Sequence, residues 1–116
     1  MSARPDVLVV VPALNEAATI AEVVDGARRH GYDVVVVDDG SSDETAALAS
    51  RAGATVLRHE RNLGVGGALQ TAFRYAHREG RHAVIQCDAD GQHAVEHLDD
   101  LVRAWRESGA DVVLGS

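Results

Sequence analysis

The sequence predicts an α/β fold with an open, mostly parallel sheet and helices on both of its faces. Three observations support this prediction: short valine-rich apolar runs, helical patterns between them, and polar clusters directly after the runs. Apolar runs without polar alternation are typical of strands buried on both faces. Their regular alternation with helices indicates β–α–β crossovers, which place helices on both sides of a sheet.

Composition limits the domain number and the class of partner. With 116 residues, 46% of them hydrophobic, the chain has room for a single core, and we expect one domain over 1–116. The formal charge of −7 argues against a nucleic acid partner, because a phosphate backbone binds to basic surfaces. The single Cys87 offers no internal disulfide, and we recognise neither a signal peptide nor a membrane span. We therefore expect a cytoplasmic protein.

The first two strand and helix units follow directly from the apolar pattern. The run Val7 to Val11 predicts a strand, and a helix follows over Ala17 to Arg29. A second strand is expected at Val34 to Val37. Ser41 and Glu44 have the spacing of a capping box, which predicts a second helix from about Asp43 to Ala52.

The rest of the chain repeats the pattern. Thr55 to Leu57 predicts a third strand, and a helix opened by a glycine cluster runs to Gly80. The glycines are Gly64, Gly66 and Gly67, Phe73 and Ala76 belong to the expected buried stripe, and we also expect Cys87 and Trp105 in the core. A fourth strand, a fourth helix and a fifth strand are expected at Ala83 to Cys87, over the stripe from Val95 to Trp105, and at Asp111 to Leu114.

Polar side chains gather after each predicted strand. Because parallel sheets bind ligands outside the carboxyl ends of their strands, we expect these clusters to share one rim. They are Asn15 and Glu16, Asp38 and Asp39, Arg58 to Asn62, and Asp88 with Asp90. The sequence therefore places a ligand site at this edge of the sheet.

The stretch VIQCDADGQH, residues 84–93, is the strongest candidate for chemistry. Asp88 and Asp90 follow a buried strand in a turn opened by Gly91. Carboxylates in such a turn suit Mg²⁺ or Mn²⁺ bound to the phosphates of a substrate. The alternative is a turn that merely caps the next helix. A zinc pair of His93 and His97 is disfavoured, because structural zinc sites need about four ligands.

The other rim residues have both a binding and a structural interpretation. Asp38 and Asp39 can accept hydrogen bonds from a ribose or a base, or they can cap the following helix. Since Ser41 and Asp43 supply that cap, we expect Asp39 to be free for a ligand. Glu16 is equally well explained as a residue of the first helical turn. The glycine cluster can hold an anion on its backbone amides.

Four motifs in order, taken together, resemble the family 2 glycosyltransferases. They read PALNE at 12–16, VVDDGSSD at 36–43, NLGVGG at 62–67 and DADGQH at 88–93. The likeness covers nearly the whole chain and is greatest to the branch of dolichyl- and polyprenyl-phosphate mannosyl- and glucosyltransferases. It implies the Rossmann-like nucleotide-binding half of a GT-A fold and inverting sugar transfer from a nucleoside-diphosphate sugar, UDP- or GDP-linked.

The resemblance also implies roles for particular residues. The nucleotide-binding residues would be Pro12, Asn15, Glu16, Asp39, Gly64 and Asp88, and the metal ligands Asp88, Asp90 and Gln92. The family often has lysine in the glycine-rich segment, where this chain has Val65, and the chain contains no lysine at all. Arg61 or backbone amides would then contact the diphosphate.

The resemblance further implies a longer enzyme. Family members continue with a segment for the acceptor, possibly a polyprenyl phosphate, so we expect the catalytic base beyond Ser116 and peripheral attachment at the cytoplasmic membrane face. The alternative is a non-catalytic nucleotide-binding module without the acceptor half. A phosphatase-like or receiver-like acidic pocket resembles the chain less, because those proteins carry the key aspartate after the first strand. An uncovered sheet edge predicts a homo-oligomer.

Overall fold

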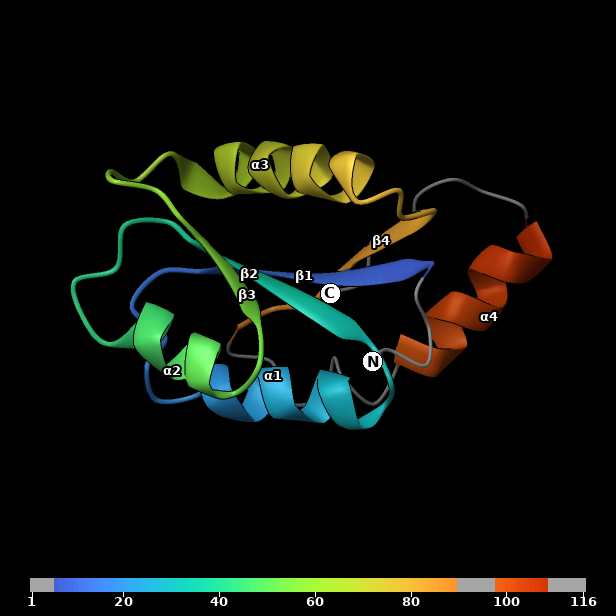
Figure 1. Ribbon diagram of the computed structural model, residues 1–116, viewed down its shortest axis with the longest axis horizontal. Coiled ribbons are helices and arrows are strands. Elements are labelled where there is room, and N and C mark those ends of the chain that lie inside the picture. The colour runs from blue at the N-terminus through green and yellow to red at the C-terminus, as the bar shows by residue number, and fades with distance from the viewer. Residues whose placement is uncertain (1–5, 90–97, 109–116) are drawn as a thin grey trace.

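The computed structural model describes residues 6–89 and 98–108 and contains a parallel sheet of four strands. The strands lie in the order β3-β2-β1-β4, so the first strand in sequence is central (Figure 1). In the register, Val10 pairs with Val35 on one side and with Gln86 on the other. The strands are β1 (Val7–Ala13), β2 (Asp33–Asp38), β3 (Thr55–Arg58) and β4 (Ala83–Gln86).

Helices cover both faces of the sheet, as the sequence predicts. Figure 1 shows α3 on one face and α1 with α2 on the other. Buried Leu98 and Val102 of α4 belong to the same core as α1. The helices are α1 (Ile20–Arg29), α2 (Thr45–Arg51), α3 (Gly64–Arg78) and α4 (Leu98–Ser108).

Strand β1 explains why its sequence lacks polar alternation. Val7, Val9 and Val11 pack into the core shared with α1, whereas Leu8 and Val10 pack into the core beneath α3. Successive side chains of a strand point to opposite faces, so a strand covered on both sides needs apolar residues throughout. The strand is two residues longer than predicted and ends at Ala13.

Two helix starts differ from the prediction. Helix α1 begins at Ile20 rather than Ala17, because the amides of Thr19 and Ile20 both donate to the carbonyl of Glu16 and close a turn first. Helix α2 begins at Thr45, and the side chain of its N-cap residue Glu44 makes no capping hydrogen bond. The capping box expected from Ser41 and Glu44 therefore does not form.

The buried face of α3 consists of alanines rather than of its aromatic residue. Ala68, Ala72 and Ala76 are buried against the sheet, while Phe73 is 37% exposed, so its prediction as a core residue is wrong. Cys87 is buried as predicted. Small side chains allow a helix backbone to approach a sheet closely, and the larger Leu69 and Tyr75 pack at the edges of the same face.

Some predictions concern parts of the chain outside the described residues. The fifth strand at 111–114 and residues Asp90, Gln92, His93 and His97 are among them, as is the side chain of Trp105.

Candidate functional site

The loops after β1 and β2 are joined by side-chain hydrogen bonds to backbone amides. The Asn15 amide donates to Ser41 Oγ at 2.8 Å, and the Ser42 amide donates to Asn15 Oδ1 at 2.8 Å. Asn15 has a left-handed φ of 54°, a conformation that asparagine tolerates better than most residues. The Glu16 amide donates to Thr45 Oγ1 at 2.9 Å. Ser41 therefore joins two loops instead of capping α2.

Asp39 connects the end of β2 to the start of α3. Its Oδ1 accepts hydrogen bonds from His59 Nδ1 and from the Leu63 amide, both at 2.8 Å. Its Oδ2 accepts from the Gly64 amide at 2.8 Å. The residue is only 5% exposed. The expectation that this carboxylate is free was wrong, because its partners come from a segment 20 to 25 residues away.

These contacts also determine the charge of Asp39. Burial alone would raise the pKa of the carboxyl group, but hydrogen bonds from Leu63, His59 and Gly64 lower it below its ordinary value. The first amides of α3 thus already hold an anion, and that anion is the protein's own carboxylate. Asn62 Oδ1 also accepts from the Gly64 amide, at 2.8 Å.

His59 extends this network into α3. Its Nε2 lies 2.8 Å from Thr71 Oγ1, and that hydroxyl donates to the carbonyl of Gly67 at 3.1 Å. The His59 amide donates to the Asp38 carbonyl at 2.9 Å. Neither His59 nor Thr71 is among the site residues predicted from the sequence. A histidine in a loop beside an acidic cluster was the available signal, but nothing in the sequence showed that it faces Asp39.

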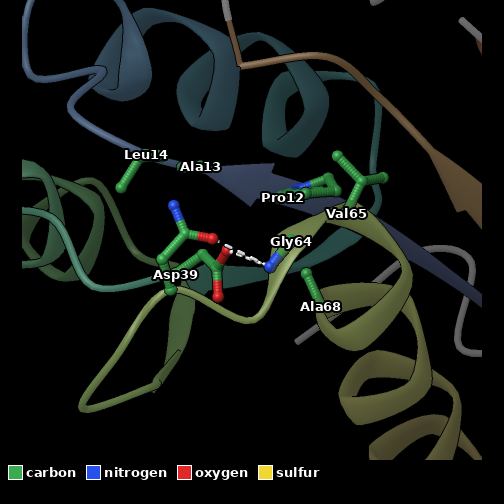
Figure 2. A pocket seen from close by; sticks show the side chains of 8 residues that line it. Pro12, Ala13, Leu14, Asp39, Gly64, Val65 and Ala68 are labelled. Atoms are coloured by element: carbon green, nitrogen blue, oxygen red, sulfur yellow. Dashed lines mark hydrogen bonds between the residues drawn. The ribbon is translucent and has the colours of Figure 1, made fainter.

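A pocket of about 280 Å³ lies at the carboxyl ends of β1 and β2. We call it the rim pocket. Figure 2 shows Pro12, Val65 and Ala68 on one side of it and Leu14 and Asp39 on the other. Leu14 and Val65 are 40% and 61% exposed, although they are large and apolar. Its lining residues are Pro12, Ala13, Leu14, Asp39, Asn62, Gly64, Val65 and Ala68.

This lining determines what the rim pocket can bind. Exposed apolar side chains around a concave site are typical of ligand pockets, in which a few polar groups orient the ligand. Here the polar groups are the Asp39 carboxylate and the Asn62 amide. The combination suits a flat ring with apolar faces and a hydrogen-bonding edge.

The structure brings many of the predicted site residues to one rim. Pro12, Asp39 and Gly64 line the rim pocket, and Asn15 and Glu16 lie in the adjoining loop. Asp88 is half-buried after β4, and the next carbonyl, that of Ala89, accepts from Thr19 Oγ1 at 2.8 Å. No group of three or more metal-binding side chains occurs among residues 6–89 and 98–108. The predicted ligands Asp90 and Gln92 lie outside those ranges.

Two further groups at the strand ends are buried, the carboxylate of Asp38 and the thiol of Cys87. Asp38 Oδ1 accepts from the Ser41 amide, and Oδ2 has an ion pair at 3.7 Å with Arg58 Nε. Burial and the charge of Asp88 raise the pKa of the Cys87 thiol to about 11. Cys87 is therefore protonated at neutral pH and is not a nucleophile. No helix in the described part of the chain is long and apolar enough to cross a membrane.

Comparison with known proteins gives one family. The model of glycosyl transferase family 2 matches residues 8–116 of the chain. Among solved structures, glucosyl-3-phosphoglycerate synthase from Mycobacterium tuberculosis, in complex with Mn²⁺, UDP and glucosyl-3-phosphoglycerate, superposes with a TM-score of 0.69 at 30% identity. The superposition covers 84% of this chain and 38% of the synthase.

Several curated relatives have named activities, including the following two. UDP-N-acetylglucosamine–dolichyl-phosphate N-acetylglucosaminyltransferase of Methanococcus voltae is 30% identical over 95% of this chain and 51% of its own length. Polyprenol monophosphomannose synthase of Mycolicibacterium smegmatis is 35% identical over 94% of this chain and 44% of its own length. The chain thus spans about half the length of these relatives.

Proposed function

The chain belongs to glycosyl transferase family 2, and from that premise we propose that it forms the donor-binding part of a metal-dependent, inverting glycosyltransferase. The observation that carries the proposal is the rim pocket, where apolar walls flank the Asp39 carboxylate at the carboxyl ends of the strands. Such a pocket suits the base of a nucleoside-diphosphate sugar. Pro12, Leu14 and Val65 would contact the faces of the base.

The diphosphate would extend from the rim pocket toward the end of β4. Asp88 lies half-buried at that strand end, and with Asp90 and Gln92 it offers the oxygen ligands that Mg²⁺ and Mn²⁺ prefer. This donor set fits a divalent cation, which would neutralise the charge of the departing diphosphate. Asn15 and Glu16 would support the nucleotide side of the site, because their loop is bonded to the loop after β2.

The acceptor is proposed from the relatives. Two of them are named for transfer to dolichyl phosphate or for synthesis of polyprenol monophosphomannose. We propose a polyprenyl phosphate acceptor for the whole protein, and therefore peripheral association with the cytoplasmic face of a membrane. A phosphate acceptor is already anionic, so it needs less help from a general base than a hydroxyl does.

Calorimetric titration tests this function. We expect UDP or GDP to bind the wild-type chain in the presence of Mn²⁺ and to bind about tenfold or more weakly after metal removal with a chelator. The Asp88→Asn variant should lose the metal dependence, whereas the exposed Asp25→Asn variant should keep it. Absence of metal-dependent binding to either nucleotide would refute the proposal.

A further inference from the structure

Asp39 has little hydrogen-bonding capacity left for a ligand. A carboxylate offers about four acceptor positions, two on each oxygen. His59 Nδ1 and the Leu63 amide fill both positions on Oδ1, and the Gly64 amide fills one on Oδ2. Residues 6–89 and 98–108 supply no other donor to either oxygen. One acceptor position, on Oδ2, therefore remains for a ligand, and Asp39 lines the rim pocket.

Asn62 supplies a donor beside that acceptor. Its Oδ1 accepts from the Gly64 amide, which fixes the orientation of the side-chain amide. The NH₂ group is then the part of the side chain that can bind a ligand, and no described residue accepts a hydrogen bond from it. Since Asn62 also lines the rim pocket, the polar edge consists of one acceptor next to one donor.

This edge distinguishes between the bases of the two donors under consideration. Uracil presents one N–H flanked by carbonyl oxygens, so it matches one acceptor and one donor. Guanine presents a carbonyl, a ring N–H and an adjacent amino group, so it needs two neighbouring acceptors. On this edge one guanine donor would find no acceptor on the protein, which lowers the affinity for guanine.

His59 is the side chain that limits how many hydrogen bonds Asp39 can accept from a ligand. Asp39 accepts only, so the 2.8 Å contact requires a proton on His59 Nδ1, and the contact of Nε2 with Thr71 holds the ring in place. The side chain of His59 is 11% exposed, which leaves it little room to turn away. Without His59, Oδ1 would regain an acceptor position.

We propose that His59 is a specificity-determining positioning residue that restricts Asp39 to a single ligand hydrogen bond and thereby selects uridine over guanosine diphosphate donors. The inference rests on the proposed nucleotide-binding function and names the base that the site takes. His59 acts through Asp39 and need not touch the nucleotide itself.

The decisive comparison uses inosine diphosphate, because hypoxanthine differs from guanine only in lacking the amino group. Calorimetry with Mn²⁺ should show that the wild type binds UDP more tightly than GDP, and IDP about tenfold or more tightly than GDP. Because IDP and GDP are both purine nucleotides, the ratio of their affinities does not depend on the size difference between purines and pyrimidines. GDP binding as tight as that of IDP would overturn the inference while the proposed function stands. Failure of all three nucleotides to bind would instead refute the proposed function and the inference with it.

Two substitutions test the contributions of the two His59 nitrogens separately. His59→Asn keeps a donor at the place of Nδ1, so the discrimination between IDP and GDP should survive. His59→Gln keeps a polar group near Nε2 that can contact Thr71 but loses the donor to Asp39, so the ratio of IDP to GDP affinity should approach one. The exposed His77→Ala serves as the control that leaves the ratio unchanged. Equal ratios in His59→Gln and the wild type would contradict the role of His59. Circular dichroism checks that each variant folds, and the wild-type ratio tests the inference without any variant.

Discussion

Replacement of Asp39 by asparagine tests the network that holds the rim together. The side chain keeps its shape but loses its charge, and one of its two oxygens becomes an NH₂ group. Three donors converge on the carboxylate, each at 2.8 Å. An amide oxygen can satisfy donors on one side only, and the NH₂ group must face at least one donor on the other. Hydrogen bonds to charged groups contribute about 1.5–3 kcal/mol each, so the variant should lose about 2–4 kcal/mol of unfolding free energy at pH 7.

The loss should depend on pH in a direction that the pKa of Asp39 sets. Because that pKa is lowered in the folded chain, the stabilisation is fully present above the pKa of the unfolded chain. It is lost as the pH falls through the lower folded value. The difference between wild type and variant should therefore stay constant from pH 7 to about pH 5 and shrink only as the pH falls below about 4.

Urea titration followed by circular dichroism measures both effects. Asp25→Asn is the matched control, because Asp25 is 62% exposed in an ion pair with Arg29 and should cost less than about 0.5 kcal/mol. A loss below about 1 kcal/mol for Asp39→Asn at pH 7, or a difference that grows toward acid, would refute the reasoning.

Four further substitutions or modifications have defined outcomes. Gly40 has a φ of +89°, and an added Cβ would lie 3.2 Å from the Asn62 amide, so Gly40→Ala should cost about 1–3 kcal/mol in urea denaturation. Gly66→Ala, where a Cβ meets nothing, should instead be neutral or stabilise by up to about 1 kcal/mol. The Cys87 thiol should resist a disulfide reagent at pH 8 until the chain is unfolded, and rapid reaction of the native chain would be unexpected. Val65→Ser should weaken UDP binding about threefold to tenfold in calorimetry without lowering stability, because Val65 is already exposed.

The strands and their common rim could be predicted because their causes are local or topological. A valine run such as β2 indicates burial on both faces, and parallel strands bring their carboxyl ends to one edge. The helix starts could not be predicted in the same way. Ser41 binds the amide of Asn15, 26 residues away, instead of capping α2, and local capping rules contain no such competitor. Asp43 does bind the Thr45 amide at the start of α2, as expected, but it also binds the distant Ala17 amide.

The candidate site, too, could be predicted from the sequence only in part. Its location follows from Asp39 and Gly64 standing after β2 and at the start of α3, which the motifs indicate. The hydrogen bonds that Asp39 accepts could not be predicted from the sequence, because its partners His59 and Leu63 reach it only once β3 lies beside β2. Phe73 shows a further limit, since helical periodicity identifies a stripe but does not fix which residues face the sheet.

The location of the nucleotide is the central claim, and NMR chemical-shift mapping tests it most directly. On addition of UDP and diamagnetic Mg²⁺, the largest shifts should occur at the amides of Leu14 and of residues 62–68 around the rim pocket. The turns at the opposite end of the sheet, at Gly31 and Gly80, should not move. Shifts concentrated at that opposite end or along α4, with the rim pocket unchanged, would contradict the account.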